Sequence, residues 1–295
     1  MSEYRETRRA RIRASYNHFK RKLPFLRTVF GQYMQNNWNV RFRKNTRVID
    51  PISAIFYITH RCNLECHYCT QKSPDILSEE LSTAKTIEVL RRIRAELSSL
   101  YITGGEPLTR PDVEEILQAA RQMRYSTILH TNGTLLDRKE GVLDSIDSLV
   151  ISLDAIDEGR FDAVTNSPAG TTRHIIQNTI RYGRQMRKSQ RPMTINCVIS
   201  PGTISDVYEV MNFCQENDFT FSCCAALTND ITQYSLLENP KYIALANHII
   251  ESKQKGALRI NGSVESLQYT LKFKNFNCYP TLFARVYPNG DVYYP

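Results

Sequence analysis

Three cysteines lie close together in the sequence, at a spacing that suits an iron–sulfur cluster. Cys62, Cys66 and Cys69 form a C-x-x-x-C-x-x-C pattern directly after an apolar run that predicts a strand. A thiolate is a soft, anionic ligand, and three thiolates can each bind one iron of a cubane four-iron, four-sulfur cluster. The fourth iron would then have no protein ligand, so it could bind a small molecule through an amine and a carboxylate.

Other readings of this loop fit less well. A zinc site usually has four ligands, and the remaining candidate, His67, stands between two of the cysteines in sequence. A ferredoxin would need a fourth cysteine nearby, and the next one is Cys197. Three unrelated core cysteines would be unusual in a polar loop that also contains Asn63 and Glu65.

The elements that must hold this loop are short apolar runs that alternate with longer helical periodicities. This alternation is typical of α/β proteins with a parallel sheet, and we expect a partial (β/α)6 TIM-like barrel whose post-strand loops meet on one face. The predicted strands cover residues 52–59, 99–103, 126–130, 148–153, 193–199 and 219–224, with a seventh near 257–260. The predicted helices cover residues 83–97, 112–124, 135–144, 172–188, 204–216 and 241–251.

Polar segments follow the second, third and fourth predicted strands. Consecutive glycines let the backbone approach a ligand closely, and a carboxylate beside them can pair with an ammonium group. Each segment alone could be a turn or a helix cap, but together, at strand ends, they favour one shared site. The residues concerned are Thr103, Gly104, Gly105, Glu106 and Pro107, then Thr131, Asn132 and Gly133, then Ser152 and Asp154.

The cysteine loop resembles the signature of the radical S-adenosylmethionine (radical SAM) superfamily, three cysteines with an aromatic residue just before the third. Tyr68 is that residue, and the resemblance implies that it contacts the adenine of the cofactor. The second segment resembles the family's Gly-Gly-Glu-Pro motif, which implies that Gly104, Gly105 and Glu106 bind the methionine amino group. The later segments resemble those that lie near the methionine and ribose, which implies contacts from Thr131, Asn132, Ser152 and Asp154.

The resemblance implies that a reduced cluster cleaves S-adenosylmethionine to methionine and a 5′-deoxyadenosyl radical, which takes hydrogen from a substrate. A flavodoxin or ferredoxin would supply electrons, and the substrate could be a peptide precursor, a small metabolite or a lipid-linked molecule. Cys223 and Cys224 could donate a hydrogen atom to a substrate radical, although burial in the core is commoner for such cysteines. Val198 and Ile199 lie where the family often contacts adenine, and we expect them to be core residues. The alternative is a non-catalytic iron–sulfur electron-transfer or metal-binding protein.

The net positive charge of the chain comes from its N-terminus. Residues 1–47 contain thirteen Lys and Arg against two Glu, interleaved with apolar residues, which predicts basic amphipathic helices interrupted at Pro24. This extension could contact an anionic membrane surface, bind a polyanion or pack on the body. The remaining residues hold 25 basic and 28 acidic side chains, so we expect no specific nucleic-acid binding. Without an apolar run long enough for a membrane span or a secretory signal, we expect a cytoplasmic protein, associated at most with the inner face of a membrane.

The C-terminal residues contain a hairpin signal, Pro288-Asn289-Gly290-Asp291. It resembles the start of SPASM or twitch domains, in which a cysteine before such a hairpin binds an auxiliary four-iron, four-sulfur cluster. Cys278 has that place, and no second cysteine follows it. We therefore expect a basic extension at 1–47, a radical SAM core at 48–262, and at 263–295 a region that either is cut short at Pro295 or never held metal.

Overall fold

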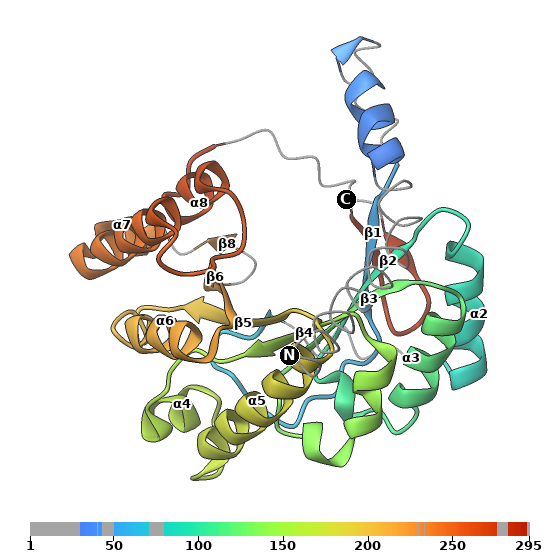
Figure 1. The fold of residues 1–295 in the computed structure, drawn as a ribbon, viewed down its shortest axis with the longest axis horizontal. Helices are drawn as coiled ribbons and strands as arrows, with labels where there is room; N and C mark the ends of the chain where they lie inside the picture. Colours follow the sequence, from blue (N-terminus) through green and yellow to red (C-terminus); the bar gives the residue numbers. More distant parts are fainter. Residues whose placement is uncertain are drawn as a thin grey trace, which may run out of the picture.

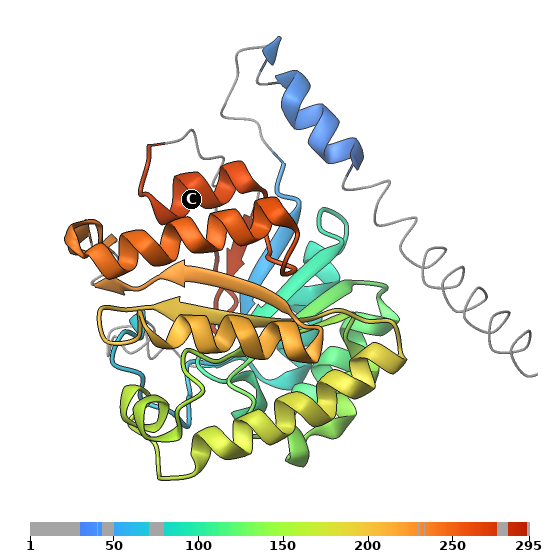
Figure 2. The same ribbon diagram turned by 60° about the vertical axis from the view of Figure 1, so that its left-hand side comes forward.

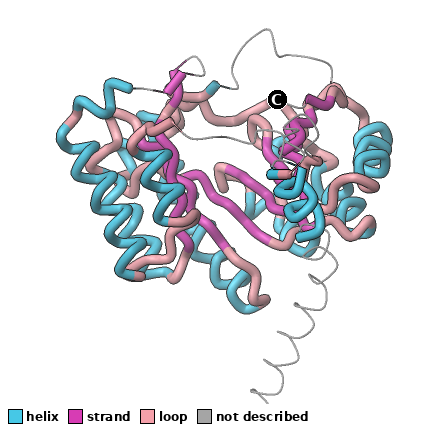
Figure 3. Tube along the Cα trace, turned by 90° about the horizontal axis from the view of Figure 1, so that it is seen from above, coloured by secondary structure: helices cyan, strands magenta, loops and turns pink. Residues whose placement is uncertain are grey.

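A curved sheet of eight strands runs through the centre of the molecule, with helices on its outer side (Figure 1, Figure 3). The structure is a computed structural model, and it describes residues 30–39, 41–42, 50–70, 80–228, 231–232, 234–275 and 283–293. The strand order is β10-β9-β1-β2-β3-β4-β5-β6. β1 to β6 are parallel neighbours in chain order, and β6 and β10 are the two end strands, so the expected partial barrel is confirmed.

The strands of this sheet are short and mostly buried. Ile102, Leu129, Ile151 and Ile195, from four successive strands, are fully inaccessible to solvent and lie in one hydrophobic core. Parallel strands covered by helices read as near-continuous apolar runs, which is why their sequence signal was clear. The strands are β1 (Ser53–Tyr57), β2 (Ser99–Thr103), β3 (Ser126–Thr131), β4 (Ser148–Ser152), β5 (Met193–Ile199) and β6 (Thr220–Ala225).

The outer helices follow the strands in the expected alternation (Figure 2). Their ends carry ordinary capping groups: the Ser82 hydroxyl accepts from the Lys85 amide at the start of α2, and Gly256, at φ 64°, ends α7. The helices are α2 (Thr83–Ile93), α3 (Val113–Gln122), α4 (Glu158–Val164), α5 (Thr171–Lys188), α6 (Asp206–Asn217), α7 (Pro240–Lys255) and α8 (Val264–Leu271).

Two predicted elements were wrong. The helix expected over 135–144 is a pair of 3₁₀ turns, η4 (Leu136–Arg138) and η5 (Glu140–Ser145), because Lys139 between them leaves the helical region at φ −135°. The strand expected near 257–260 is only an isolated bridge between Ile260 and Phe221. The helices α4 and α8 were not predicted, and both are too short to show a strong periodicity.

The C-terminal hairpin is present and joins the main sheet. β9 (Phe283–Val286) pairs in parallel with β1, and β10 (Val292–Tyr293) pairs antiparallel with β9 across the predicted turn, where Gly290 has a φ of 90°. The smaller strands β7 (Leu227–Thr228) and β8 (Ile231–Thr232) form a separate two-stranded ribbon. The auxiliary role of 263–295 stays a prediction, since Cys278 lies outside the described residues.

Candidate active site

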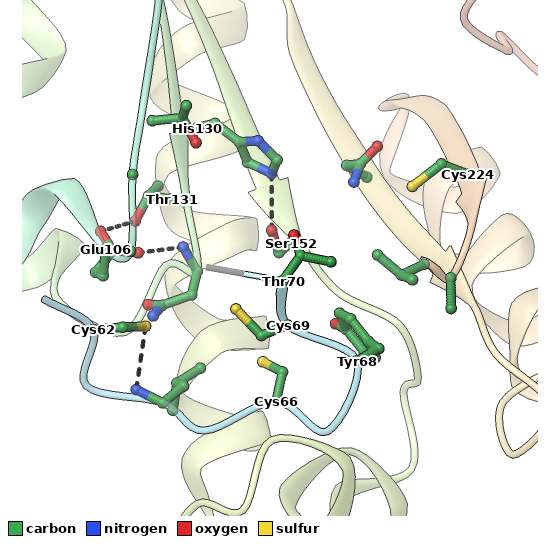
Figure 4. A pocket seen from close by; sticks show the side chains of 18 of the residues that line it. Cys62, Cys66, Tyr68, Cys69, Thr70, Glu106, His130, Thr131, Ser152 and Cys224 are labelled. Atoms are coloured by element: carbon green, nitrogen blue, oxygen red, sulfur yellow. Dashed lines mark hydrogen bonds between the residues drawn. The ribbon is translucent and has the colours of Figure 1, made fainter. Parts of the chain in front are cut away.

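A cavity of about 410 Å³ opens at the carboxyl ends of the strands, where the sequence places its polar segments (Figure 4). This volume falls in the range of roughly 300–1,000 Å³ that small-molecule sites occupy. The three clustered cysteines line it together with the exits of β2, β3, β4 and β6. The lining residues are Cys62, Leu64, Cys66, Tyr68, Cys69, Thr70, Thr103, Gly104, Gly105, Glu106, His130, Thr131, Asn132, Ser152, Asn196, Val198, Cys224, Ala225 and Ala226.

The segment before the cysteines is bonded to the exit of β2 through backbone groups. The Gly105 amide donates to the Thr59 carbonyl at 2.8 Å, and the Glu106 amide donates to the Arg61 carbonyl at 2.7 Å. A Cβ atom at Gly104 or Gly105 would lie 2.3 Å from the Thr59 or Arg61 carbonyl oxygen. The glycines are therefore required by the contact between these two backbones, in addition to any approach to a ligand.

The cysteine loop is held on its other side by the end of α4. The Glu65 amide donates to the Thr165 carbonyl at 2.9 Å, and the His67 amide donates to the Val164 carbonyl at 3.1 Å. The His67 ring also donates, through Nε2, to the Ala163 carbonyl at 2.9 Å. His67 is thus engaged with α4 and is not among the residues lining the cavity, in agreement with its dismissal as a metal ligand.

Side-chain amides connect the cysteine loop to the exit of β3. Asn63 donates to the Thr134 hydroxyl at 2.8 Å and accepts from Asn132 at 3.0 Å, while Asn132 in turn accepts from the Thr134 amide at 3.0 Å. Asn63 was seen in the sequence only as a polar loop residue, and Thr134 was not singled out. No spacing rule could have found them, because the contact joins the segments after β1 and β3, which are far apart in the sequence and are separated by β2 in the sheet.

Glu106 is a buried carboxyl that connects the exits of β2 and β3 (Figure 4). Its Oε1 accepts from the Leu108 amide at 2.9 Å and the Thr131 hydroxyl at 2.7 Å, and its Oε2 accepts from the Asn132 amide at 2.6 Å. Burial nevertheless raises the pKa of Glu106 to about 7, because the three donors only partly replace lost hydration. Pro107 is buried beside it and does not line the cavity.

Tyr68 and Asp154 form a pair at the edge of the cavity. The Tyr68 hydroxyl donates to Asp154 Oδ2, and Asp154 Oδ1 accepts from the Val198 amide at 2.8 Å. Asp154 is fully buried, and burial raises its pKa to about 6. Tyr68 lines the cavity, and Asp154 lies behind it. In this structure Asp154 therefore contacts Tyr68 and does not line the cavity itself.

Ser152 and His130 lie opposite the cysteines. His130 is enclosed between the Ser152 hydroxyl and the Tyr101 hydroxyl, and its burial lowers the pKa of the ring to about 4. The ring is therefore neutral near pH 7. His130 was not predicted as a site residue, although it precedes Thr131 directly in a predicted strand end.

The two predicted cysteines of β6, Cys223 and Cys224, point to opposite faces of the strand. Cys224 lines the cavity across from Cys62, whereas Cys223 is partly buried against the core, because successive strand residues point to opposite faces (Figure 4). Val198 also lines the cavity, so its assignment to the core was wrong, while Ile199 is fully buried as expected.

The three thiols could hold an iron–sulfur cluster, because thiolates are soft ligands that suit iron and sulfide. They line one wall of the same cavity, and burial, followed by the charges of Asp154, Cys69 and Cys62, raises the pKa of Cys66 to about 12. Iron would have to displace that proton. Within the described residues, no group of three or more His, Cys, Asp or Glu side chains converges tightly enough to hold one metal ion.

The α/β half-barrel and the three thiols at its carboxyl edge point to one class of enzyme, and comparison with known protein families identifies that class. The Radical SAM superfamily model matches residues 56–214, and the chain belongs to that superfamily. A curated relative, the PqqA peptide cyclase of Gluconobacter oxydans, is 31% identical over 172 residues, covering 56% of this chain and 46% of the relative. The probable GTP 3′,8-cyclase of Methanococcus aeolicus is 27% identical over 167 residues, covering 54% of each chain. The chain thus spans about half the length of these curated relatives.

Solved structures show the same fold. SuiB of Streptococcus suis bound to S-adenosylmethionine superposes with a TM-score of 0.66 at 18% identity, covering 86% of this chain and 62% of SuiB. The crystal structure of SuiB with the precursor peptide SuiA gives a TM-score of 0.64, again at 18% identity, covering 84% of this chain and 60% of SuiB. The likeness supports the unclosed barrel.

Proposed function

We propose that this protein is an enzyme that cleaves S-adenosylmethionine reductively and uses the product to modify a peptide. The observation that carries the first part is the shared cavity wall: three thiols from one loop face the exits of β2, β3 and β4, within the superfamily match. The alternative, an electron-transfer protein with the same cysteines, would have no use for a nucleotide-sized cavity beside its cluster.

Separate sets of residues would bind the two cofactors. Cys62, Cys66 and Cys69 would hold the iron–sulfur cluster, and the exits of β2 to β4 would hold S-adenosylmethionine, with Tyr68 as the aromatic contact for adenine. When bound, these cofactors supply a 5′-deoxyadenosyl radical that removes a hydrogen atom from the substrate. The chain itself orients the bound molecules and limits water access, which protects reactive intermediates. A flavodoxin or ferredoxin would supply the electrons.

A peptide substrate is favoured by the relatives and by the cavity lining. One curated relative is named a peptide cyclase, and a structural relative is known with a precursor peptide. The other curated relative is named a probable GTP cyclase, but the described lining here consists of thiol, aliphatic, aromatic and neutral polar side chains with a single carboxyl, Glu106. Such a lining suits an uncharged segment better than a polyanion, because phosphate sites are built with Arg, Lys or helix N-termini. The cavity also reaches β6, an end strand of the sheet, where an extended chain could enter.

Cys224 is our candidate for a hydrogen donor to the substrate. Its side chain is exposed to the cavity, where desolvation by the surrounding wall and then the charge of Asp154 raise its pKa to about 11, so the thiol keeps its proton near pH 7. Cys223 points away from the cavity and is not favoured for this role. The membrane contact expected from residues 1–47 remains a prediction.

The decisive experiment is anaerobic reconstitution with iron and sulfide, followed by reduction with dithionite and addition of S-adenosylmethionine. We expect bound iron and 5′-deoxyadenosine, both lost in Cys62→Ala, Cys66→Ala and Cys69→Ala. Cys214→Ala is the matched control, since Cys214 is buried in α6 away from the cavity and should leave the iron content unchanged.

The outcomes separate the two functions. Iron without 5′-deoxyadenosine would favour the electron-transfer alternative, and zinc in place of iron would refute both. The substrate class is tested separately by adding candidate peptides and GTP to the active enzyme and measuring which one raises 5′-deoxyadenosine formation.

A further inference from the structure

The helix over residues 30–39 exposes its apolar side chains to solvent, whereas an ordinary surface helix packs them against the body. Phe30, Met34, Trp38 and Phe42 recur every fourth residue, and each is at least half exposed, from 52% at Met34 to 66% at Phe42. Residues four apart share one helix face, so these side chains form a single apolar stripe, which Tyr33, at 54% exposed, widens. We call this stripe, with Tyr33, the aromatic face.

The opposite side of the helix is polar and attaches it to the body. Asn36 donates to the Asp50 carbonyl at 2.9 Å and accepts from the Asp50 amide at 3.0 Å, and Gln32 donates to the Glu96 carbonyl at 3.0 Å. Asn36 is buried, with 5% of its surface exposed. These amide contacts fix the orientation of the helix, so the aromatic face points away from the body, and the helix projects near the start of β1 (Figure 1, Figure 2).

A large exposed apolar surface of this kind marks an interaction site. The partner's chemistry follows from the charge around it. Residues 30–39 contain no charged side chain, whereas residues 1–47 as a whole carry thirteen Lys and Arg against two Glu, with Arg41 exposed beside Phe42. An uncharged aromatic face within a strongly basic segment matches the layering of an anionic lipid surface, where apolar groups enter the acyl boundary and cations stay among the headgroups.

We propose that the aromatic face docks this protein on the surface of an anionic phospholipid bilayer. No described helix has the length and apolar character needed to cross a bilayer, and the proposed contact lies in the interface. Trp and Tyr are favoured at that depth because their rings are amphipathic. Nucleic acid is the weaker candidate, because the cations around the face could pair with its phosphates but the exposed Met and Phe side chains would gain no apolar environment there.

The test uses Trp38, which is the single tryptophan of the chain, so tryptophan emission reports on this face alone. Full-length protein is mixed with vesicles of phosphatidylglycerol and phosphatidylcholine in equal parts, or of phosphatidylcholine alone, and emission and co-sedimentation are measured. We expect a blue shift and co-sedimentation with the anionic vesicles, weakened by high salt. The double variant Met34→Ser/Phe42→Ser, which keeps Trp38, should bind at least about tenfold more weakly, since buried methylene groups carry most of the affinity.

The matched control is Ile243→Ser, an exposed apolar residue on α7, which should bind vesicles like the wild type. Failure of the anionic vesicles to shift the emission would overturn the proposal, as would equal binding to phosphatidylcholine alone. Self-association without lipid that Met34→Ser/Phe42→Ser abolishes would assign the face to a second copy of the chain. An equal emission shift with single-stranded DNA would assign it to nucleic acid. Either result would also refute a lipid-specific role.

Discussion

His130 Nε2 lies 2.8 Å from the Ser152 hydroxyl, and Nδ1 of the same ring lies 2.9 Å from the Tyr101 hydroxyl. The ring thus connects β2, β3 and β4 inside the barrel, beside the cavity. Two hydroxyl partners can serve a neutral imidazole, one as donor and one as acceptor, but a protonated ring must donate twice and also bury a charge.

This arrangement predicts an acid-sensitive contribution to stability. The pKa of His130 falls from 6.5 to about 4 on folding, so below pH 6.5 the unfolded chain takes up a proton that the folded protein does not. Stability is therefore unaffected above pH 6.5 and lost as the pH falls toward 4. Relative to His130→Gln, the wild-type protein should lose about 3 kcal/mol of unfolding free energy over that interval, measured by urea titration. A constant difference between the two proteins across this range would refute the burial of a neutral ring.

Glu106 should show the opposite pH dependence. Its pKa rises from 4.5 to about 7 on folding, so the folded protein holds the proton more tightly and the related stability is lost as the pH rises from 4.5 to 7. Glu106→Gln removes this titration. The NH₂ group of the glutamine would face the Asn132 or Leu108 amide, which is also a donor, and we expect this to lower the unfolding free energy by about 1–3 kcal/mol at all pH values. We expect the wild type to lose about 3 kcal/mol relative to the variant between pH 4.5 and 7. Glu115→Gln, at an exposed position on α3, is the control for any general effect of removing a carboxyl.

Gly105 should tolerate no side chain. A Cβ atom there would lie 2.3 Å from the Arg61 carbonyl oxygen, which is backbone and can move only with the segment that leads into the cysteines. Gly105→Ala should cost about 1–3 kcal/mol of stability, or more, and should lower the iron content after reconstitution. Gly202→Ala, where a Cβ atom would have no neighbour within 4 Å, should change neither quantity. Normal iron content in Gly105→Ala would show that the two loops are not in contact as described.

Arg110 is a buried cation whose loss should be severe. Its Nη1 donates to the Ile58 carbonyl at 2.7 Å, its Nη2 donates to the Leu81 carbonyl at 2.8 Å, and its Nε pairs with Asp112 at 2.7 Å. Arg110→Met would leave Asp112 and these carbonyls without their partner, and we expect a loss of about 3–5 kcal/mol by chemical denaturation. Arg92→Met breaks an exposed pair with Glu88 and should cost about 1 kcal/mol or less. Similar losses in both variants would contradict the buried network.

The parts of this fold that the sequence predicted share one physical property: they depend on local periodicity or on one contiguous loop. The bounds of β2 and β5 were predicted to the residue, and Cys62, Cys66 and Cys69 lie together as their spacing indicates. The helix predicted over 135–144 failed because amphipathic periodicity does not show where a residue such as Lys139 leaves the helical region.

The features that the sequence did not predict depend on contacts between segments that are distant in the chain. The pairing of β9 with β1 joins residues more than two hundred positions apart, and no local signal specifies it. The His130–Ser152 contact likewise joins two neighbouring strands, and the Asn63–Thr134 contact joins the segments after β1 and β3, which β2 separates in the sheet. The orientation of Asp154 toward Tyr68 belongs to the same group, because a motif names a residue without fixing the direction of its side chain.

The backbone bonds from the cysteine loop to the β2 exit and to α4 have a consequence for metal loading. Peptide groups make these contacts, so most substitutions leave them in place, and the thiols keep their positions before any iron arrives. The free energy of binding the iron is then not reduced by the cost of ordering the chain. In zinc fingers, by contrast, the chain is unfolded without metal, and binding must also fold it. Demetallation by a chelator should therefore be reversible and leave a folded apoprotein that accepts iron and sulfide again.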